Sequence, residues 1–242
     1  MIMSYQRLSL SACLAVLALG CIGPQGTQPC TETASNSAAP ADGSKEAPAA
    51  EAPLVEAVIP KGTLIWDGQG ISNLPDSVEP PGSWFVYSDK TPTGVKKPPS
   101  VEEFPSALEN GAIHTTGKGY TEWGGGIGTN LCGAPMLTPV DASKYKGIRF
   151  KASGTTPMKF LVATVITMPE FGRCKKCYDH HRVIINNLSK EMKTYEFKWD
   201  DLKQTGWGDK AKFDTKMLVG LNWTSKDAMS WDFSIDDVAF IE

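Results

Sequence analysis

The residues with the clearest potential for chemistry lie between Cys174 and Arg182, where two cysteines, an aspartate and two histidines occur close together. Two thiolates and two imidazoles, from Cys174, Cys177, His180 and His181, form a ligand set that suits zinc. Cysteines of an exported protein usually form disulfides instead. Because the chain is predicted below to be exported, we favour a Cys174–Cys177 disulfide and keep a metal-sensing loop as the alternative.

Two further cysteines of the expected mature chain, Cys30 and Cys132, lie far from this pair in the sequence. Four cysteines allow three pairings, and the sequence does not select among them. A Cys30–Cys132 disulfide therefore stays open, although it would join a loop to a segment that we expect to be disordered.

The residues after Cys177 begin a predicted strand with polar side chains. Alternation along a strand places Asp179 and His181 on one face and His180 and Arg182 on the other. A carboxylate, an imidazole and a guanidinium near aromatic rings are groups with which a binding module can fix sugar hydroxyls. Asp179, His181 and Arg182 are therefore candidate ligand contacts. The alternative is a solvated strand end with one histidine packed inward.

The seven tryptophans are the second chemical signal, because flat aromatic rings are surfaces on which sugar faces stack. Trp66, Trp199 and Trp231 sit in apolar alternation, which indicates core positions. Trp123 precedes a glycine run and Trp223 lies between two polar residues. These neighbours favour Trp123 and Trp223 as exposed ligand contacts.

The sequence has no recognisable catalytic constellation. A glycosidase needs two carboxylates across a cleft, and no pair is marked as such. Nucleophile-elbow, phosphate-loop and zinc-protease motifs are absent from the sequence, and it contains three histidines in all. We therefore expect a binding protein rather than an enzyme.

The elements that position these residues are predicted to be strands. Short runs of branched and aromatic residues are separated by Gly, Pro, Asn and Asp clusters, which is typical of strands and turns. Several runs alternate between apolar and charged residues, and the run over 160–166 is apolar on both sides, as in a covered strand. Residues 101–109 are expected to form a loop or one or two helical turns. The predicted strands are residues 63–67, 84–88, 112–116, 125–130, 147–152, 159–167, 181–186, 194–199, 217–224 and 231–241.

This pattern predicts the fold class. Eight to ten strands with such turns form two packed antiparallel sheets, an all-β sandwich of the jelly-roll type. Residues 62–242 are long enough for one such domain.

The chain begins with the layout of a signal peptide over residues 1–20, where a short polar stretch precedes an apolar run. The run is too short to span a bilayer. The segment Ala18-Leu19-Gly20-Cys21 resembles a bacterial lipobox, although its first two residues depart from the usual order. We therefore expect a lipid anchor at Cys21, with plain secretion as the alternative. The residue after the cysteine is not Asp, which by the same resemblance favours the outer membrane or cell surface.

The segment that follows, residues 21–61, is rich in Ala, Pro and Ser and poor in aromatic and branched residues. Such a composition buries too little apolar surface to fold, so we expect a disordered tether. The formal net charge of −3 gives no electrostatic footprint for nucleic acid, and we exclude that partner.

The order of motifs in residues 62–242 resembles the galactose-binding-like jelly-roll superfamily, especially family eleven carbohydrate-binding modules and complex I intermediate-associated domains. The resemblance rests on segments 66–68, 82–87, 123–128, 141–150, 200–208 and 235–240. It implies binding of polysaccharide, β-glucan-like, on a concave sheet that carries Asp, His, Arg and Tyr. It also implies that the loop with Trp207 closes over the sandwich edge, where Trp207 packs.

Carboxylates near the two ends of the domain suggest a structural calcium ion. Asp67 lies near the first strand, and Asp236 and Asp237 lie in the last, which are neighbours when such a sandwich closes. Carboxylate and carbonyl oxygens suit Ca²⁺, and related modules often carry one there. Adjacent strand residues point to opposite faces, so one of the two, Asp237 by preference, joins Asp67. The alternative is an N-terminal turn and a solvated edge pair.

The sequence therefore predicts an exported, non-catalytic binding module for a polysaccharide or a cell-surface glycan. A protein-interaction or envelope-assembly lipoprotein that uses the same fold is the alternative.

Overall fold

The computed structural model describes residues 56–70, 72–73, 77–133, 137–227 and 229–242. The predicted signal peptide, the predicted lipidation site Cys21, the cysteine Cys30 and most of the predicted tether lie outside the described residues. Within the described ranges, no helix is long and apolar enough to cross a membrane.

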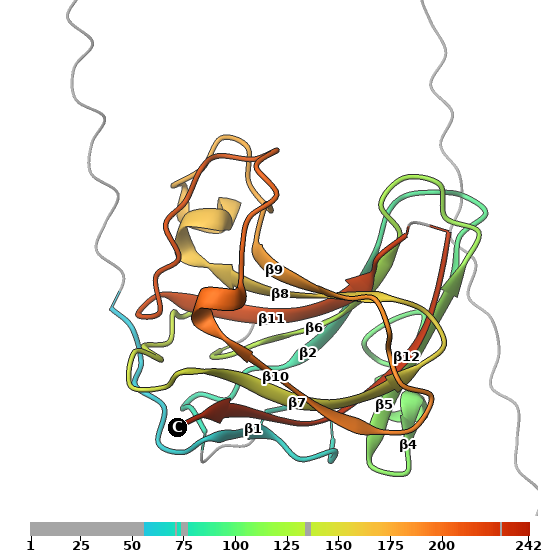
Figure 1. The fold of residues 1–242 in the computed structure, drawn as a ribbon, viewed down its shortest axis with the longest axis horizontal. Coiled ribbons are helices and arrows are strands. Elements are labelled where there is room, and N and C mark those ends of the chain that lie inside the picture. Colours follow the sequence, from blue (N-terminus) through green and yellow to red (C-terminus); the bar gives the residue numbers. More distant parts are fainter. Residues whose placement is uncertain (1–55, 71, 74–76, 134–136, 228) are drawn as a thin grey trace, which may run out of the picture. The chain divides into compact units, whose positions relative to one another are not determined.

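The strands form two antiparallel sheets, which confirms the predicted all-β sandwich (Figure 1). The five-stranded sheet has the order β2 (Trp84–Ser88), β6 (Gly125–Asn130), β11 (Leu218–Ser225), β8 (Met158–Thr164) and β9 (His181–Ile185). The seven-stranded sheet has the order β10 (Lys193–Lys198), β7 (Gly147–Gly154), β12 (Ser230–Ile241), β5 (Ala112–Lys118) and β3 (Val95–Lys97), with β1 (Leu64–Trp66) beside β12 and β4 (Leu108–Glu109) beside β5.

In the described parts of the chain, four short 3₁₀ helices connect the strands: η1 (Phe104–Ala107), η2 (Val165–Thr167), η3 (Pro169–Phe171) and η4 (Trp199–Asp201). The first is the helical turn expected within 101–109. The second cuts short the strand predicted over 159–167, because the hydroxyl of Thr167 bonds to the backbone N–H and the carbonyl of Thr164. Side-chain bonds of this kind compete with the strand ladder and bend the chain.

Aromatic rings fill the space between the sheets. The ring of Trp84 lies 5.0 Å from that of Trp66 and 5.3 Å from that of Trp223, and Trp223 meets Phe150 edge to face at 5.4 Å. These side chains are fully buried. Each buried large apolar side chain stabilises the fold by about 1.5–3 kcal/mol, so this chain of rings fixes the two sheets against each other.

The ordered domain begins slightly before the predicted boundary at residue 62. Val58 forms an isolated bridge with Val140, and the backbone N–H of Lys61 donates to the carbonyl of Ser77. Residues 58–61, which the composition assigns to the tether, are thus hydrogen-bonded to the sandwich.

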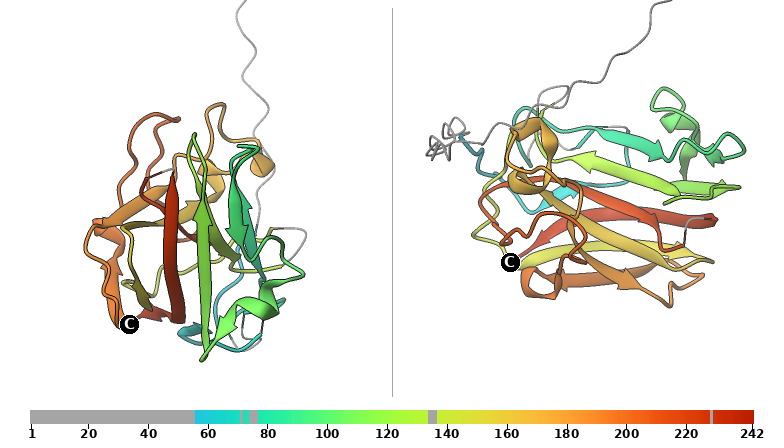
Figure 2. Two further views of the ribbon diagram at one scale, coloured as in Figure 1. Left: turned by 90° about the vertical axis from the view of Figure 1, so that its right-hand side faces the viewer. Right: turned by 90° about the horizontal axis from the view of Figure 1, so that it is seen from above.

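Loops rise at both ends of the five-stranded sheet (Figures 1 and 2). The β8–β9 and β10–β11 connections stand at one end, and the β2–β3 and β5–β6 connections stand at the other. The outer face of this sheet, which is the face turned away from the seven-stranded sheet, lies between them.

Candidate functional site

Cross-strand register defines which side chains share the outer face of the five-stranded sheet. Residues paired across neighbouring strands point to the same face, and residues one position along point to the opposite face. The row through Ile127, Trp223 and Phe160 faces the core. The two rows beside it therefore face outward; they are Phe85, Gly128, Asn222, Leu161 and Arg182, and Tyr87, Gly126, Thr224, Lys159 and Ile184.

Three aromatic side chains form a strip at the β2 edge of this face, which we call the aromatic strip. The rings of Phe85 and Tyr87 are 5.9 Å apart, and the ring of Trp123 stacks on Tyr87 at 6.1 Å with an interplanar angle of 28°. Trp123 is 51% exposed, whereas Phe85 and Tyr87 are half-buried. The prediction that Trp123 is a surface residue is thus confirmed.

Glycines on β6 let the aromatic strip lie low against the sheet. A Cβ atom on Gly128 would lie 2.5 Å from Cζ of Phe85 and 2.5 Å from Oδ1 of Asn222. Because Gly128 has none, the Phe85 ring extends over the β6 backbone. The strip therefore presents ring surface above Asn222, which is itself 9% exposed. Exposed ring surface is what a binding site offers to a sugar face.

A buried carboxylate fixes the loop that carries Trp123. One oxygen of Asp89 accepts hydrogen bonds from the backbone N–H groups of Glu122, Trp123 and Gly124 at 3.3, 3.0 and 2.8 Å, and the other accepts the N–H of Thr91 at 2.9 Å. Desolvation alone would raise the pKa of Asp89, but these bonds outweigh it and lower the pKa to about 2. Asp89 therefore positions Trp123 without touching the outer face itself.

We expect Asp89→Ala to free the Trp123 loop, because it leaves four backbone N–H donors without their acceptor, three of them in that loop. Unsatisfied buried donors and lost charged hydrogen bonds cost about 1–3 kcal/mol of unfolding free energy. Since the folded pKa is depressed, this stabilisation is complete above pH 3.8 and disappears as the pH falls towards 2. Urea unfolding of the wild type and of Asp89→Ala at pH 7 and at pH 2.5 measures the difference in unfolding free energy between the two proteins.

Asp141→Ala is the matched control, because Asp141 also accepts a backbone N–H, from Ser143 at 2.9 Å, but lies outside the Trp123 loop. Its loss of unfolding free energy at pH 7 should be smaller than that of Asp89→Ala, because one backbone N–H loses its acceptor instead of four. If Asp89→Ala lost as much unfolding free energy at pH 2.5 as at pH 7, the role of the ionised Asp89 in holding the Trp123 loop would be contradicted.

Polar groups continue the outer face across the sheet. The hydroxyl of Tyr87 is hydrogen-bonded to Thr224, whose own hydroxyl donates to the carbonyl of Gly125 at 2.8 Å. Desolvation raises the pKa of Tyr87, so its phenol stays protonated. Desolvation and then the nearby Arg182 lower the pKa of Lys159, which is half-buried and forms no ion pair with any described residue.

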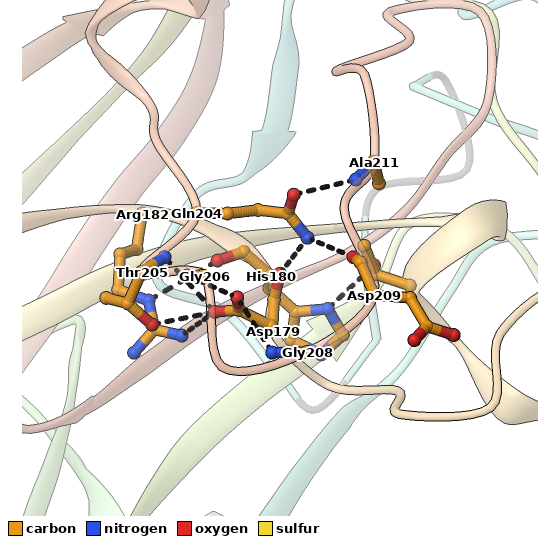
Figure 3. Close-up of polar contacts among 10 residues, drawn as sticks. Asp179, His180, Arg182, Gln204, Thr205, Gly206, Gly208, Asp209 and Ala211 are labelled. Atoms are coloured by element: carbon orange, nitrogen blue, oxygen red, sulfur yellow. Dashed lines mark hydrogen bonds and ion pairs between the residues drawn. The ribbon is translucent and has the colours of Figure 1, made fainter.

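Asp179 is a structural residue and not the ligand contact that the sequence predicts (Figure 3). Its carboxylate is 1% exposed and pairs with Nη2 of Arg182 at 2.8 Å. The same carboxylate accepts hydrogen bonds from the loop after β10; the donors are the backbone N–H and the hydroxyl of Thr205 and the N–H groups of Gly206 and Gly208. Desolvation opposes ionisation, but these bonds lower its pKa. Both carboxylate oxygens of Asp179 therefore accept hydrogen bonds from within the protein. Through its ion pair, Asp179 orients Arg182 on the outer face.

The two histidines are also internal. His181 shares a face with core residues, is 5% exposed and bonds through Nε2 to the carbonyl of Ala211 at 3.2 Å. The side chain of His180 lies 2.8 Å from the hydroxyl of Thr167, and burial lowers its pKa to about 4. His181 is therefore not a contact on the outer face. The strand alternation does place Arg182 on the face opposite His181, as predicted.

Two of the tryptophan predictions are wrong. Trp223 is fully buried and stacks on Trp84, so it cannot contact a ligand. Its polar neighbours Asn222 and Thr224 lie on the outer face, which puts Trp223 itself inside. Trp207, predicted to pack at the sandwich edge, is 55% exposed. The core positions of Trp66, Trp199 and Trp231 are confirmed.

The cysteine prediction is confirmed for one pair. Cys174 and Cys177 form a disulfide, so their sulfurs are not available as metal ligands. Cys132 is buried and free, and its pairing with Cys30 falls outside what the structure describes.

The carboxylates of the predicted calcium site are arranged differently from the expectation. Asp237 has φ = +46° at a β-bulge and pairs with Nζ of Lys151 at 2.5 Å. Asp236 is the one near this end of the chain, because a Cβ on Gly68, the residue after Asp67, would lie 2.8 Å from Oδ1 of Asp236. Desolvation is the main cause that raises the pKa of Asp236. Asp67 itself accepts the N–H of Gln69. Among the described residues, no three His, Cys, Asp or Glu side chains converge on one point.

Several site residues were not singled out from the sequence: Phe85, Tyr87, Asp89, Lys159, Asn222 and Thr224. The alternation in Trp84-Phe85-Val86-Tyr87 contained the signal for Phe85 and Tyr87. If Trp84 faces the core, residues 85 and 87 must face outward. Asp89 lies 34 residues from Trp123, and only the folded chain brings them together.

Fold and site together define a two-sheet antiparallel jelly-roll sandwich with an aromatic strip on the outer face of one sheet. No family model matches the chain, and no curated protein matches it. The sandwich is structurally similar to carbohydrate-binding modules. A family 11 module from Clostridium thermocellum, solved with a β-1,3-1,4-mixed-linked tetrasaccharide, is 15% identical over 76% of this chain and 96% of its own, with a TM-score of 0.47.

Two other carbohydrate-binding modules are also similar in structure. The family 11 module of the cellulase Lic26A-Cel5E from Clostridium thermocellum is 16% identical over 74% of this chain and 94% of its own, with a TM-score of 0.48. A family 30 module from Clostridium thermocellum is 10% identical over 78% and 95%, with a TM-score of 0.38. At these values the similarity transfers no ligand, site residue or activity to this chain.

Proposed function

We propose that the protein is a non-catalytic binding module that holds a polysaccharide on the outer face of its five-stranded sheet. The observation that carries the proposal is the aromatic strip, three rings about 6 Å apart that continue into polar side chains. Rings in series offer stacking surfaces to successive sugars, and the half-buried Lys159 on the same face offers hydrogen bonds to hydroxyls. The sequence resemblance makes β-glucans the first candidates.

Affinity electrophoresis tests this proposal on a panel of soluble neutral polysaccharides that includes β-glucans, xylan and galactan. We expect at least one of them to retard the native protein, and Trp123→Ala to restore normal migration. Unchanged migration throughout the panel would contradict the proposal. Capture of an envelope protein that is lost on the same substitution would favour the protein-interaction alternative.

We propose further that the chain is exported and held at the outer membrane or cell surface by acylation of Cys21. The support is the sequence alone: the signal-peptide layout of residues 1–20 and the lipobox-like segment before Cys21. Mass spectrometry of the mature N-terminal peptide tests it. A peptide that begins at Cys21 without acyl chains would contradict the anchor.

We propose a structural calcium site formed by Asp67 with Asp236. Gly68 follows Asp67 in the sequence, and a Cβ there would stand 2.8 Å from Oδ1 of Asp236 and 2.0 Å from the carbonyl oxygen of Gly111. Two carboxylates and a carbonyl are ligands that Ca²⁺ accepts, with water completing the six to eight it needs.

The calcium test uses thermal unfolding of the wild type and of Asp236→Asn, each in chelator and in excess Ca²⁺. At a calcium concentration about 100 times Kd, the wild type should gain about 2.7 kcal/mol. Because the pKa of Asp236 is raised, its ionised form destabilises the fold above that pKa, so Asp236→Asn should be the more stable protein in chelator. A wild type whose stability is the same in both conditions would contradict the calcium site.

A further inference from the structure

A pocket of about 900 Å³ lies away from the aromatic strip, against the end of β10, η4 and the loop that leads to β11. None of the strip residues lines it. Its size is within the range of ligand-binding cavities. The loop that closes it contains Gly206 and Gly208.

The charged side chains that line this pocket are mostly cationic. Four lysines line it, Lys146, Lys198, Lys203 and Lys210, against a single carboxylate, Asp200, among the described residues. None of the four ammonium groups forms an ion pair with a described residue. Charges of one sign around a cavity add their fields and repel each other, which favours the entry of an anion. The protein as a whole carries −3, so this positive potential is local.

Apolar ring surface lies between the lysines. Phe213 is half-buried in the lining, its ring 5.7 Å from that of Trp199 and 5.0 Å from that of His181. Desolvation lowers the pKa of His181, so the imidazole is neutral at pH 7 and does not add to the charge. The lining therefore combines an aromatic floor with a cationic rim.

The wall of the pocket is held in place before any ligand arrives (Figure 3). The amide of Gln204 donates to the carbonyls of Asp179 and Asp209 and accepts the N–H of Ala211 at 2.8 Å. The buried carboxylate of Asp179 holds the N–H groups of Gly206 and Gly208. A wall fixed in this way loses little conformational entropy on binding.

We propose that this pocket, which we call the lysine pocket, is a second binding site, for an acidic oligosaccharide. A sugar ring would pack on Phe213, and its carboxylate or sulfate groups would meet the ammonium groups of the rim. A neutral sugar would gain hydrogen bonds but no charge attraction from the four lysines, and a small inorganic anion would leave the aromatic floor uncovered.

Isothermal titration calorimetry of the mature protein tests the proposal with three oligosaccharides of equal length: an oligogalacturonate, a sulfated galactan and a neutral galactan. We expect one or both acidic ligands to bind, with affinity that falls as NaCl is raised. The comparison of carboxylate with sulfate identifies the preferred anion. Anionic lipid vesicles serve as a fourth ligand. The proposal would be overturned if the neutral oligosaccharide bound as tightly as the acidic ones. It would also be overturned if neither acidic oligosaccharide bound, whether or not the vesicles did.

The variant Lys198→Ala/Lys203→Ala should weaken acidic binding about ten-fold, which corresponds to about 1.4 kcal/mol. The matched control is Lys190→Ala/Lys193→Ala, two exposed lysines outside the pocket, and it should bind as the wild type does. Equal losses in both variants would show a general charge effect and overturn the site. Trp123→Ala should retain acidic binding, so this inference and the proposed function fail independently.

Discussion

Replacing Trp123 or Tyr87 by alanine should weaken binding of the retained polysaccharide about 30-fold each. A central aromatic contact contributes about 2 kcal/mol when it is truncated, which is about 30-fold in Kd. Trp123 is half-exposed in a loop, so its loss should barely change the melting temperature. Tyr87 lies on β2 and is hydrogen-bonded to Thr224, so its loss should lower the melting temperature as well. Isothermal titration calorimetry with the soluble polysaccharide measures Kd for the wild type and for both variants.

Trp207→Ala is the matched control for Trp123→Ala. The two tryptophans are almost equally exposed, at 55% and 51%, and Trp207 belongs to the loop at the opposite end of the sheet. Its removal should leave neutral polysaccharide binding unchanged. Equal losses for the two variants, or no loss for Trp123→Ala, would show that the strip is not the binding surface.

Replacing Asp179 by alanine should give the largest loss of stability. The change leaves Arg182, whose side chain is 13% exposed, without its partner, and it leaves the N–H groups of Thr205, Gly206 and Gly208 without an acceptor. Breaking a mostly buried ion pair costs about 3–5 kcal/mol. For a domain of this size that corresponds to a fall in melting temperature of roughly 10 °C.

The effect of Asp179→Ala should depend on pH. The folded pKa of Asp179 is lowered, so its stabilisation is complete above pH 3.8 and decreases as the pH falls through the folded pKa. Asp209→Ala, which removes an exposed acceptor of the same loop, is the control and should have a much smaller effect. A melting temperature of Asp179→Ala within two or three degrees of the wild type, roughly 1 kcal/mol, would contradict the structural role.

The sequence was sufficient to predict the sandwich fold, because strands and turns are indicated by residues that are close together in the chain. Strand 125–130 and strand 84–88 were predicted with the observed bounds, since turn residues flank each run. Strands β3 and β4 were missed; at three and two residues they are too short to show any periodicity. The Cys174–Cys177 disulfide followed from the predicted export of the chain, because cysteines of exported proteins usually form disulfides.

The site was predicted less well, because its geometry depends on contacts between distant segments. Trp223 was misassigned because its polar neighbours were taken as its surroundings, although alternation places them on the opposite face. Asp179 precedes the first residue of β9, so strand alternation did not apply to it. Its burial follows from the loop over 204–208, which folds onto it from 25 or more positions away.

The most direct test of the central claim is to map amide chemical shifts of the labelled domain on titration with a β-glucan oligosaccharide, or with another neutral oligosaccharide retained in the electrophoresis panel. We predict that the shifts concentrate on the outer face of the five-stranded sheet, at Phe85, Gly126, Gly128 and Thr224. His114 and Asp232, which pair with each other on the seven-stranded sheet, should not move. Shifts confined to the seven-stranded sheet, with Gly126 and Gly128 unchanged at saturation, would contradict the account.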